Sequence, residues 1–435
     1  MSGFVTLGDI TTLITKGTTP SAKLGGFSMS GVNFIKSESL KYDGSIDVTK
    51  FVFISEETNK KLQRSILRPN DILLSIAGAN LGKCGLVTPQ MLPANTNQAV
   101  AILRLDETKA DPRFVQFFLR NPQFVANNLA GVAQSAQPNL NLGDIAKFRI
   151  PDWPLPEQRE IAGILGALDD KIELNRRMAA TLEEMARSLY RSWFVDFDPV
   201  HAKAAGHPPA HMDKTTAALF PDRFGGDGLP EGWVREGLLQ QAEWVNGAAY
   251  KNMHFSNHPD ALPVVKIAEL KAGITGNTKF TTTDLGEKFR ICRGELLFSW
   301  SGNPDTSIDA FIWHLGDAWL NQHIFVVRPN GKMSKAMLFS CLRFFNPEMA
   351  EIARNKQTTG LGHITRKDLE AFPVCVASQS VVRSFEDKIQ PLFDRYCDCL
   401  YQNQTLATLR DSLLPRLMSG ELRVGAAREL IGDVA

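Results

Sequence analysis

The sequence predicts an α+β protein built as an internal repeat, in which each of two globular domains is followed by a long helix. Three observations lead to this prediction. The chain has 435 residues, enough for two or three domains. One register relates its two halves. Two long segments, 154–194 and 378–418, have the apolar spacing of helices that pair as a coiled coil.

The internal repeat is a constant shift of 224 residues over most of each half. It places the stretch 71–78, DILLSIAG, on the stretch 295–302, ELLFSWSG. The shift also aligns Asn97-Gln98 with Asn321-Gln322 and Arg104 with Arg328. Nearer the start the shift becomes about 230, pairing Gly17 with Gly247 and Lys36 with Lys266, as changes in loop length would produce.

The first globular domain is expected over 1–153 and the second over 233–376. Short apolar runs bounded by Gly, Pro and Asn predict strands, namely DILLSIAG, NQAVAILRL, GELLFSWSG and HIFVVRP. Amphipathic segments predict helices in both domains, namely DPRFVQFFLRN and SKAMLFSCLRFF. Two α+β domains of similar size follow from this mixture.

The helix segments 154–194 and 377–435, the second including a tail, each contain a heptad seam. The first seam consists of Ile161, Leu165, Leu168, Ile172, Asn175, Ala179, Leu182, Ala186, Leu189 and Trp193. The second consists of Phe385, Ile389, Leu392, Tyr396, Cys399, Asn403, Leu406, Arg410, Leu413 and Leu417. Mostly apolar seams favour a coiled coil, with two ordinary core helices as the alternative. Residues 195–232, rich in Pro, Gly and Ala, are expected to connect the two copies.

Composition excludes several classes of protein. No apolar run reaches the length of a membrane span, and the first residues lack a signal peptide. Six cysteines without paired spacing are expected to be core thiols of a cytoplasmic protein. The net charge is only +1, although the globular domains are mildly basic and the helices with the connection are mildly acidic. That distribution is compatible with contact between the domains and phosphates.

Motifs for catalysis are incomplete. The stretch GANLGKC, Gly78 to Cys84, resembles a phosphate-binding loop but is one residue short, and Cys84 replaces the hydroxyl that binds Mg²⁺. The second copy has GNPDTSI there, without lysine. Irregularly spaced His201, His207 and His211 do not predict a metal site. The chain is therefore expected to be non-catalytic, to bind no metal and to bind no cofactor, with nucleotide hydrolysis at Gly78–Cys84 as a rival hypothesis.

Several motifs resemble one protein family. The stretches PLPEQREIAGILGALDDKIELNRRM, LYRSWFVDFDPVHAKAAG, MDKTTAALFPDRF, LPEGW and LLPRLMSGEL resemble the specificity subunits of type I restriction–modification enzymes. The resemblance extends over essentially the whole chain and is strongest in the helices and the connection. In the second copy ASQSVVRS replaces LPEQREIA, which predicts a looser entry into the second helix.

The resemblance implies two target recognition domains and an antiparallel pairing of the two helices. It implies that double-stranded DNA is bound as an asymmetric, bipartite target. It further implies that two methyltransferase subunits are held, which use S-adenosylmethionine, with two restriction–motor subunits completing a restriction enzyme. A free-standing DNA-binding regulator with the same repeat is the alternative.

Candidate reading residues are polar or basic side chains in loops between strands. In the first domain the loop Ser75–Lys83 is favoured, and the candidates are Lys36, Asn80, Lys83, Gln134, Ser135, Gln137 and Asn139. In the second domain they are Lys266, Ser301, Asn303, Lys356, Gln357 and Thr358. The repeated Asn-Gln pairs and the repeated arginines are either structural or phosphate-binding. Partner subunits are expected to dock on helix residues off the seam, namely Met178, Met185, Tyr190 and Phe194.

Overall fold

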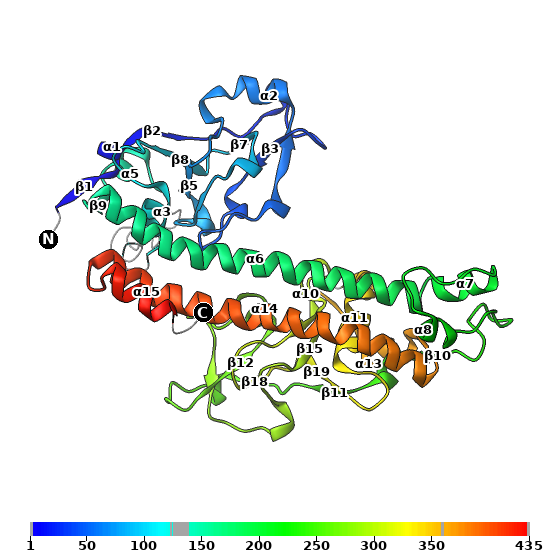
Figure 1. Ribbon diagram of the computed structural model, residues 1–435. Helices are drawn as coiled ribbons and strands as arrows, with labels where there is room; N and C mark the ends of the chain where they lie inside the picture. Colours follow the sequence, from blue (N-terminus) through cyan, green and yellow to red (C-terminus); the bar gives the residue numbers. More distant parts are fainter. Residues whose placement is uncertain (1–2, 122–123, 125–138, 358–360, 433–435) are drawn as a thin grey trace. The chain divides into compact units, whose positions relative to one another are not determined.

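The structure is a computed structural model that describes residues 3–121, 124, 139–357 and 361–432 (Figure 1). The chain divides into two compact units. Unit 1 is Met1–Lys171 with Leu406–Ala435, and unit 2 is Ile172–Thr405. The two predicted long helices are confirmed as α6 (Leu155–Phe194) and α14 (Gln379–Ser419), and each contributes a segment to both units.

Unit 1 contains two sheets and a strand pair. The larger sheet has the order β2 (Thr11–Lys16), β8 (Val100–Leu105), β5 (Ile72–Ser75) and β6 (Cys84–Leu86), all antiparallel. The smaller sheet is β4 (Val52–Ile54), β3 (Val32–Ile35) and β7 (Ala94–Thr96), and the pair is β1 (Phe4–Thr6) with β9 (Arg149–Pro151). Its other helices are α1 (Leu7–Ile10), α2 (Glu56–Lys61), α3 (Pro112–Arg120), α5 (Leu142–Ala146) and α15 (Val424–Gly432).

Unit 2 has the same plan. Its larger sheet is β11 (Ala242–Asn246), β19 (Ile324–Pro329), β15 (Leu296–Ser299) and β17 (Asp309–Ile312). The smaller sheet is β13 (Phe280–Thr281), β12 (Leu262–Val265), β18 (Ala318–Leu320) and β14 (Arg290–Ile291). Two pairs remain, β10 (Val234–Gly237) with β21 (Pro373–Val376) and β16 (Ser301–Gly302) with β20 (Gly362–His363). The helices are α7 (Asp198–Ala204), α8 (Lys214–Ala218), α9 (Ile267–Ala272), α10 (Pro304–Ser307), α11 (Lys335–Phe344), α12 (Asn346–Asn355) and α13 (Arg366–Ala371).

The two units confirm the predicted repeat strand by strand. Strands β5, β7 and β8 begin 224 positions before β15, β18 and β19, as Ile72 does before Leu296. Gly17 and Gly247 occupy the same crowded point, because a Cβ on either would approach a carbonyl oxygen of Thr96 or Asn321 to within 2.1 and 2.2 Å. A side chain has no room at either point, so both copies retain glycine there.

Within each unit the segments of α6 and α14 run antiparallel. In unit 1, Asp169 is ion-paired with Arg410, and Gly420 lies against the ring of Trp153. In unit 2, Asn175 donates to Gln402 Oε1 at 3.2 Å, and Trp193 packs against Phe385 in a tilted arrangement with ring centroids 5.4 Å apart. The seam residues are mostly buried, and they share hydrophobic clusters with the domain in the same unit. The helices are therefore both a paired coil and part of each unit's core.

The C-terminal end of α14 follows a local sequence signal. α14 ends before Gly420, whose φ of 76° is the left-handed conformation that favours glycine after a helix. The looser entry expected for α14 is not seen, because Val381 and Val382 in its first turn are buried in the core of unit 2. The connection 195–232 is also folded: it forms α7 and α8, and Val200 and Phe220 are buried.

Two further expectations concern composition. Five of the six cysteines are buried, but Cys292 is exposed, so the expectation of core thiols is wrong at that position. Cys292 follows the two-residue strand β14 at the edge of the smaller sheet, where few side chains are available to cover it. Within the described parts of the chain, no helix is both long enough and apolar enough to cross a membrane.

Candidate nucleic-acid interface

The first candidate surface lies in unit 1 around the loop that joins β5 to β6. An isolated bridge pairs Ala77 in this loop with Asn139, which is 62 residues later in the chain. Lys83 Nζ donates to Asn80 Oδ1 at 2.7 Å, and Asn80 Nδ2 donates to Ser37 Oγ at 3.4 Å. Because Ser37 follows Lys36, the structure brings four predicted residues together: Lys36, Asn80, Lys83 and Asn139.

Cations on this surface lie over aromatic rings. Lys36 Nζ is 4.8 Å from the centroid of the Phe27 ring, and Lys83 Nζ is 5.1 Å from that of Tyr42. Burial lowers the pKa of Lys83 below its ordinary value; the nearby charge of Lys50 lowers it further, and Glu38 opposes the shift. These contacts hold positive charge at a fixed place beside polar groups suited to base edges and phosphates.

The same loop does not form a phosphate-binding loop. Gly78–Asn80 is a single 3-10 turn (η5), and the chain then enters β6 rather than a helix. No helix N-terminus is therefore available to receive a phosphate here. Cys84 is buried, and burial raises the pKa of its thiol to about 12. The geometry disfavours the nucleotide-hydrolysis hypothesis.

The second candidate surface, in unit 2, repeats the first with different side chains. β16 pairs with β20 so that Ser301 lies opposite His363, and this bridge is the Ala77–Asn139 bridge shifted by 224 positions. Asn303 caps α10 by accepting from the Asp305 backbone N–H at 2.9 Å.

A lysine also stands beside the second loop. Lys271 Nζ lies 3.5 Å from Ser307 Oγ, and Ser307 is the counterpart of Lys83. Lys271 lies on α9, whereas Lys83 lies in the loop between β5 and β6. Burial lowers its pKa, with Asp309 opposing the shift.

The remaining predicted residues of unit 2 are placed less uniformly. Lys266 Nζ lies 5.3 Å from the centroid of the Phe255 ring. Lys356 is ion-paired with Asp368, so much of its charge is already neutralised within the unit. The pKa of Asp368 is lowered overall, because hydrogen bonds from Lys356 and Thr365 outweigh the burial that raises it. Gln357 is exposed after the end of α12.

Comparison with known proteins gives the family. Residues 2–184 match the model of the type I restriction modification DNA specificity domain. The chain is 25% identical over 417 residues to the type I restriction enzyme MjaIX specificity subunit of Methanocaldococcus jannaschii, covering 94% of this chain and 90% of that protein. The chain belongs to the specificity subunits of type I restriction–modification systems.

Two further relatives of this specificity subunit agree. The HindI specificity subunit of Haemophilus influenzae is 24% identical over 333 residues, which are 66% of this chain and 71% of that one. The crystal structure of the type I restriction–modification S subunit from M. genitalium has the same fold, with a TM-score of 0.51 at 16% identity over 96% of both chains. These relatives are named as specificity subunits, so the alternative of a free-standing regulator is not favoured.

The remaining predicted residues of the specificity subunit are not among those described at the two candidate surfaces. Gln134, Ser135, Gln137 and Thr358 lie outside the described residues. Ser75, predicted to begin the favoured loop, is buried at the end of β5, because that strand is covered on both faces. Arg104 and Arg328 are structural: they form equivalent ion pairs with Asp71 and Glu295 at 2.7 and 2.8 Å.

The predicted partner-binding residues divide into two groups. Tyr190 and Phe194 are only 1% and 2% exposed, so their predicted docking role is wrong. They pack against aromatic rings of unit 2, including Phe344 and Phe385, because the domain covers this side of α6 as well as the seam. Met185 is 51% exposed, and Met178 is half-buried.

A hollow lies beside a long helix in each unit. In unit 2 a groove of about 1030 Å³ is lined by Met185 and Leu189 of α6, Pro199 of α7 and Met212. Lys388 of α14 also lines it.

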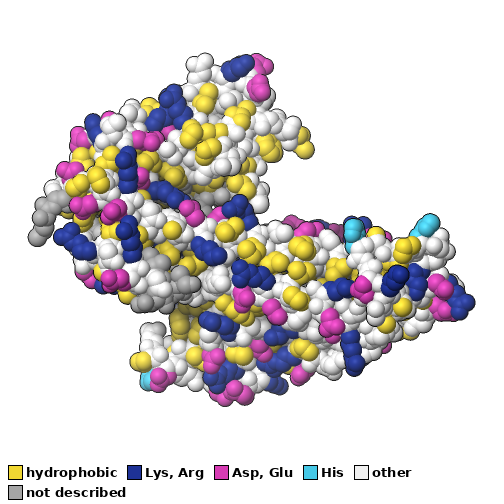
Figure 2. All heavy atoms as spheres, in the orientation of Figure 1, with side chains coloured by type: hydrophobic (Ala, Val, Ile, Leu, Met, Phe, Trp, Pro, Cys, Tyr) yellow, Lys and Arg dark blue, Asp and Glu magenta, His cyan; other side chains and the backbone are white. Residues whose placement is uncertain are grey.

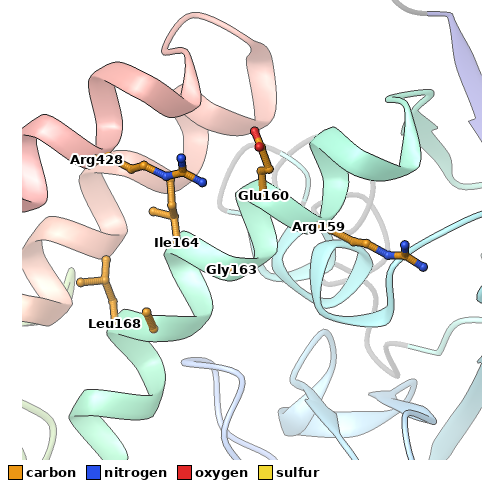
Figure 3. Close-up of a pocket in the computed structure, with 7 residues that line it drawn as sticks. Arg159, Glu160, Gly163, Ile164, Leu168 and Arg428 are labelled. Carbon is orange, nitrogen blue, oxygen red and sulfur yellow. The ribbon is translucent and has the colours of Figure 1, made fainter.

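In unit 1 a pocket of about 530 Å³ lies between α6 and α15 (Figure 3). There Arg428 lies beside Ile164, while Arg159 points away from α15. Under the 224-residue shift, Ile164 is the counterpart of Lys388, which lines the groove in unit 2.

The distribution of charged side chains does not help to locate these sites. Lys and Arg are interspersed with Asp and Glu over the face seen in Figure 2, in keeping with a net charge of +1. Among the residues that the structure describes, no three His, Cys, Asp or Glu side chains gather where they could hold a metal ion. Three residues at the two candidate surfaces were not predicted from the sequence: Tyr42, Lys271 and His363.

Proposed function

We propose that this specificity subunit reads an asymmetric, bipartite target in double-stranded DNA, with one half read by each unit. One observation supports the proposal above all others. The two units present the same bridge and loop with different side chains, so that Ala77 and Asn139 in one correspond to Ser301 and His363 in the other. Identical readers would favour a palindrome, whereas diverged readers favour two unlike half-sites.

The candidate side chains have the chemistry that this task needs. Asn80 and Asn139 offer amide groups that can pair with adenine, and His363 and Ser301 offer other hydrogen-bonding groups at the equivalent place. Lys36, like Lys266 in unit 2, can contact phosphate and so fix the register without reading sequence.

Two methyltransferase subunits would dock on the two hollows beside the long helices, one in each unit. The groove at Met185 supports this assignment, because it presents apolar surface that an isolated chain leaves in water. Burying such a methionine contributes about 1.5–3 kcal/mol to association. In a complete restriction enzyme, two restriction–motor subunits would join the same assembly.

The chain itself would carry no active site and bind no cofactor. The methyltransferase subunits would bind S-adenosylmethionine and transfer the methyl group. Consistent with this division, the Cys84 thiol in the loop that resembles a phosphate site is buried, with a pKa raised to about 12, and is not available as a nucleophile.

The test is expression of this chain with its methyltransferase in a host free of adenine methylation, followed by sequencing of methylated positions. The expected result is one split, asymmetric motif, and no methylation when either chain is expressed alone. Methylation by this chain alone, or an uninterrupted motif, would contradict the proposal.

A further inference from the structure

In each unit one methionine projects almost completely into solvent from the same loop of the fold. Met29, in the loop from β2 to β3, is 96% exposed, and Met253, in the loop from β11 to β12, is 83% exposed. Single exposed apolar residues are common on protein surfaces. The recurrence of such a methionine in the same loop of two diverged domains is what needs a reason, since the local shift of about 230 residues places Met29 opposite Pro259 and not opposite Met253.

The loop around Met29 is held in place on its inner side. The Phe27 ring packs edge-on against Phe34 of β3, with centroids 5.5 Å apart. The Ser28 backbone N–H donates to the Phe53 carbonyl at 2.8 Å. Met29 therefore projects from an anchored segment.

The loop around Met253 is anchored in a different way. Met253 lies in the 3-10 turn η8 (Asn252–His254), and the carbonyl of His254 accepts from the Thr281 hydroxyl. Phe255, two residues after Met253, packs against a buried cluster that includes Trp319. The anchoring contacts differ between the units, yet both leave the methionine exposed.

A lysine that directly follows the next strand, β3 or β12, lies beside each loop. Lys36 lies over Phe27 and Lys266 lies over Phe255, at 4.8 and 5.3 Å from the ring centroids. The loop sequences GGFSMSG and KNMHFS have little in common apart from methionine and phenylalanine. The shared arrangement is thus a surface of methionine, phenylalanine and lysine, which we call the Met–Lys tip.

The first Met–Lys tip is continuous with the candidate reading surface. Lys36 is followed by Ser37, which accepts the hydrogen bond from Asn80. DNA held by Asn80 and Lys83 would therefore lie close to Lys36 and its tip. The positive charge of the lysine suits a phosphate, and an unbranched, polarizable methionine side chain can adapt to an apolar part of a groove.

We propose that Met29 and Met253 make apolar contacts in a groove of the bound DNA, while Lys36 and Lys266 contact the adjoining phosphates. This inference rests on the proposed DNA-reading function and adds a pair of contact residues in each half-site. The methionines supply apolar contact of the kind that side chains make with thymine methyl groups or between base steps.

Methionine oxidation tests the proposal on the assembled complex. The complex of this chain with its methyltransferase subunits is treated briefly with hydrogen peroxide, with and without a duplex that carries the methylated motif. Sulfoxide at each methionine is measured by peptide mass spectrometry. We expect oxidation of Met29 and Met253 to slow by roughly fivefold or more when the duplex is added. Met185 is the control, because the docked methyltransferase should shield it to the same degree with and without the duplex.

Substitution gives a second measurement. Met29→Ala or Met253→Ala should weaken duplex binding roughly tenfold, as expected for losing a buried apolar contact, without changing the dependence on salt. Lys36→Gln should lower the salt slope by about 0.9. Val234→Ala, which removes another exposed apolar side chain, should change neither.

The outcomes separate this inference from the proposed function. If the complex retains the duplex but Met29 and Met253 oxidise as fast as before, the inference is wrong and the reading function stands. Protection by methyltransferase alone would assign the tips to protein contact and would also overturn it. If the complex retains no duplex at all, the proposed function and the inference fall together.

Discussion

Asp169 of α6 holds two buried arginines in unit 1, and its replacement tests how the helices are joined to the first domain. Asp169 Oδ2 lies 2.8 Å from Arg120 Nη1 of α3, and Asp169 Oδ1 lies 2.8 Å from Arg410 Nη1 of α14. The side chains of Arg120 and Arg410 are only 5% and 8% exposed. One carboxylate thus connects the domain with both long helices.

Asp169→Asn should destabilise unit 1 strongly. The substitution keeps the shape of the side chain but removes the carboxylate that two buried guanidinium groups share, and leaves Arg410 paired with Asp411. Removing one partner of a buried ion pair costs about 3–5 kcal/mol. For a unit of this size, each kcal/mol lowers the melting temperature by roughly 2–4 °C, which predicts a fall of about 6–20 °C.

The neighbouring residue provides a matched control. Asp170 is also paired with an arginine of α3, Arg113, but the two side chains are 63% and 39% exposed. Exposed pairs contribute only about 0–1 kcal/mol, so Asp170→Asn should lower the transition by a few degrees at most. Calorimetry of both variants measures the difference. Equal effects of the two substitutions, or a shift of under 2 °C for Asp169→Asn, would refute this explanation of how the helices are joined.

Three further predictions concern the partners, the spacer and the DNA contacts. Met185→Asp should abolish capture of methyltransferase on affinity beads with little change in melting temperature. Tyr190→Ala should cost about 3–5 kcal/mol of stability and should affect capture only through folding. The reverse pattern would restore the docking role of Tyr190. Seven residues added within Leu168–Ile172 and again within Leu392–Tyr396 keep both heptads and lengthen each helix by ~10 Å. The unread spacer in the methylated motif should therefore grow by about three base pairs. Active enzyme with an unchanged spacer would show that the helices do not set the spacer length. Lys83→Gln should reduce the slope of binding affinity against salt by about 0.9 in filter-binding assays, and an unchanged slope would remove Lys83 from the phosphate contacts.

The sequence was most informative where one physical signal dominates. Strands β5, β8, β15 and β19 are central and covered on both faces, so they appear as continuous apolar runs. The long helices appear as heptads. Strands of two residues, such as β16 and β20, have no periodic signal and form only because distant segments meet.

The errors at Tyr190 and Phe194 have a physical origin. A heptad specifies one buried seam, but the far side of α6 in unit 2 is covered by aromatic residues of the domain and the connection. Nothing in the spacing of α6 itself reports that second interface. Large aromatic residues off a seam were therefore as consistent with a second core as with a docking face.

At the candidate surfaces, too, contacts between distant segments could not be predicted from local sequence. One residue, however, could have been predicted from the repeat. The approach of Asn139 to the loop that holds Asn80 depends on the Ala77–Asn139 bridge, which local pattern cannot reveal. His363 could have been found, because the 224-residue shift applied to Asn139 leads directly to it. Lys271 could not be found in this way, because the sequence counterpart of Lys83 is Ser307. Lys271 lies on α9 and comes close to Ser307 only in the folded domain.

The central claim is that each unit reads its own half of one target. Its most direct test is methylome sequencing after residues 1–153 are replaced by the corresponding domain of another specificity subunit, with the methyltransferase and residues 154–435 unchanged. We expect a motif in which one half-site changes while the other half-site and the spacer length stay the same. A motif changed in both halves, or in neither, would contradict it.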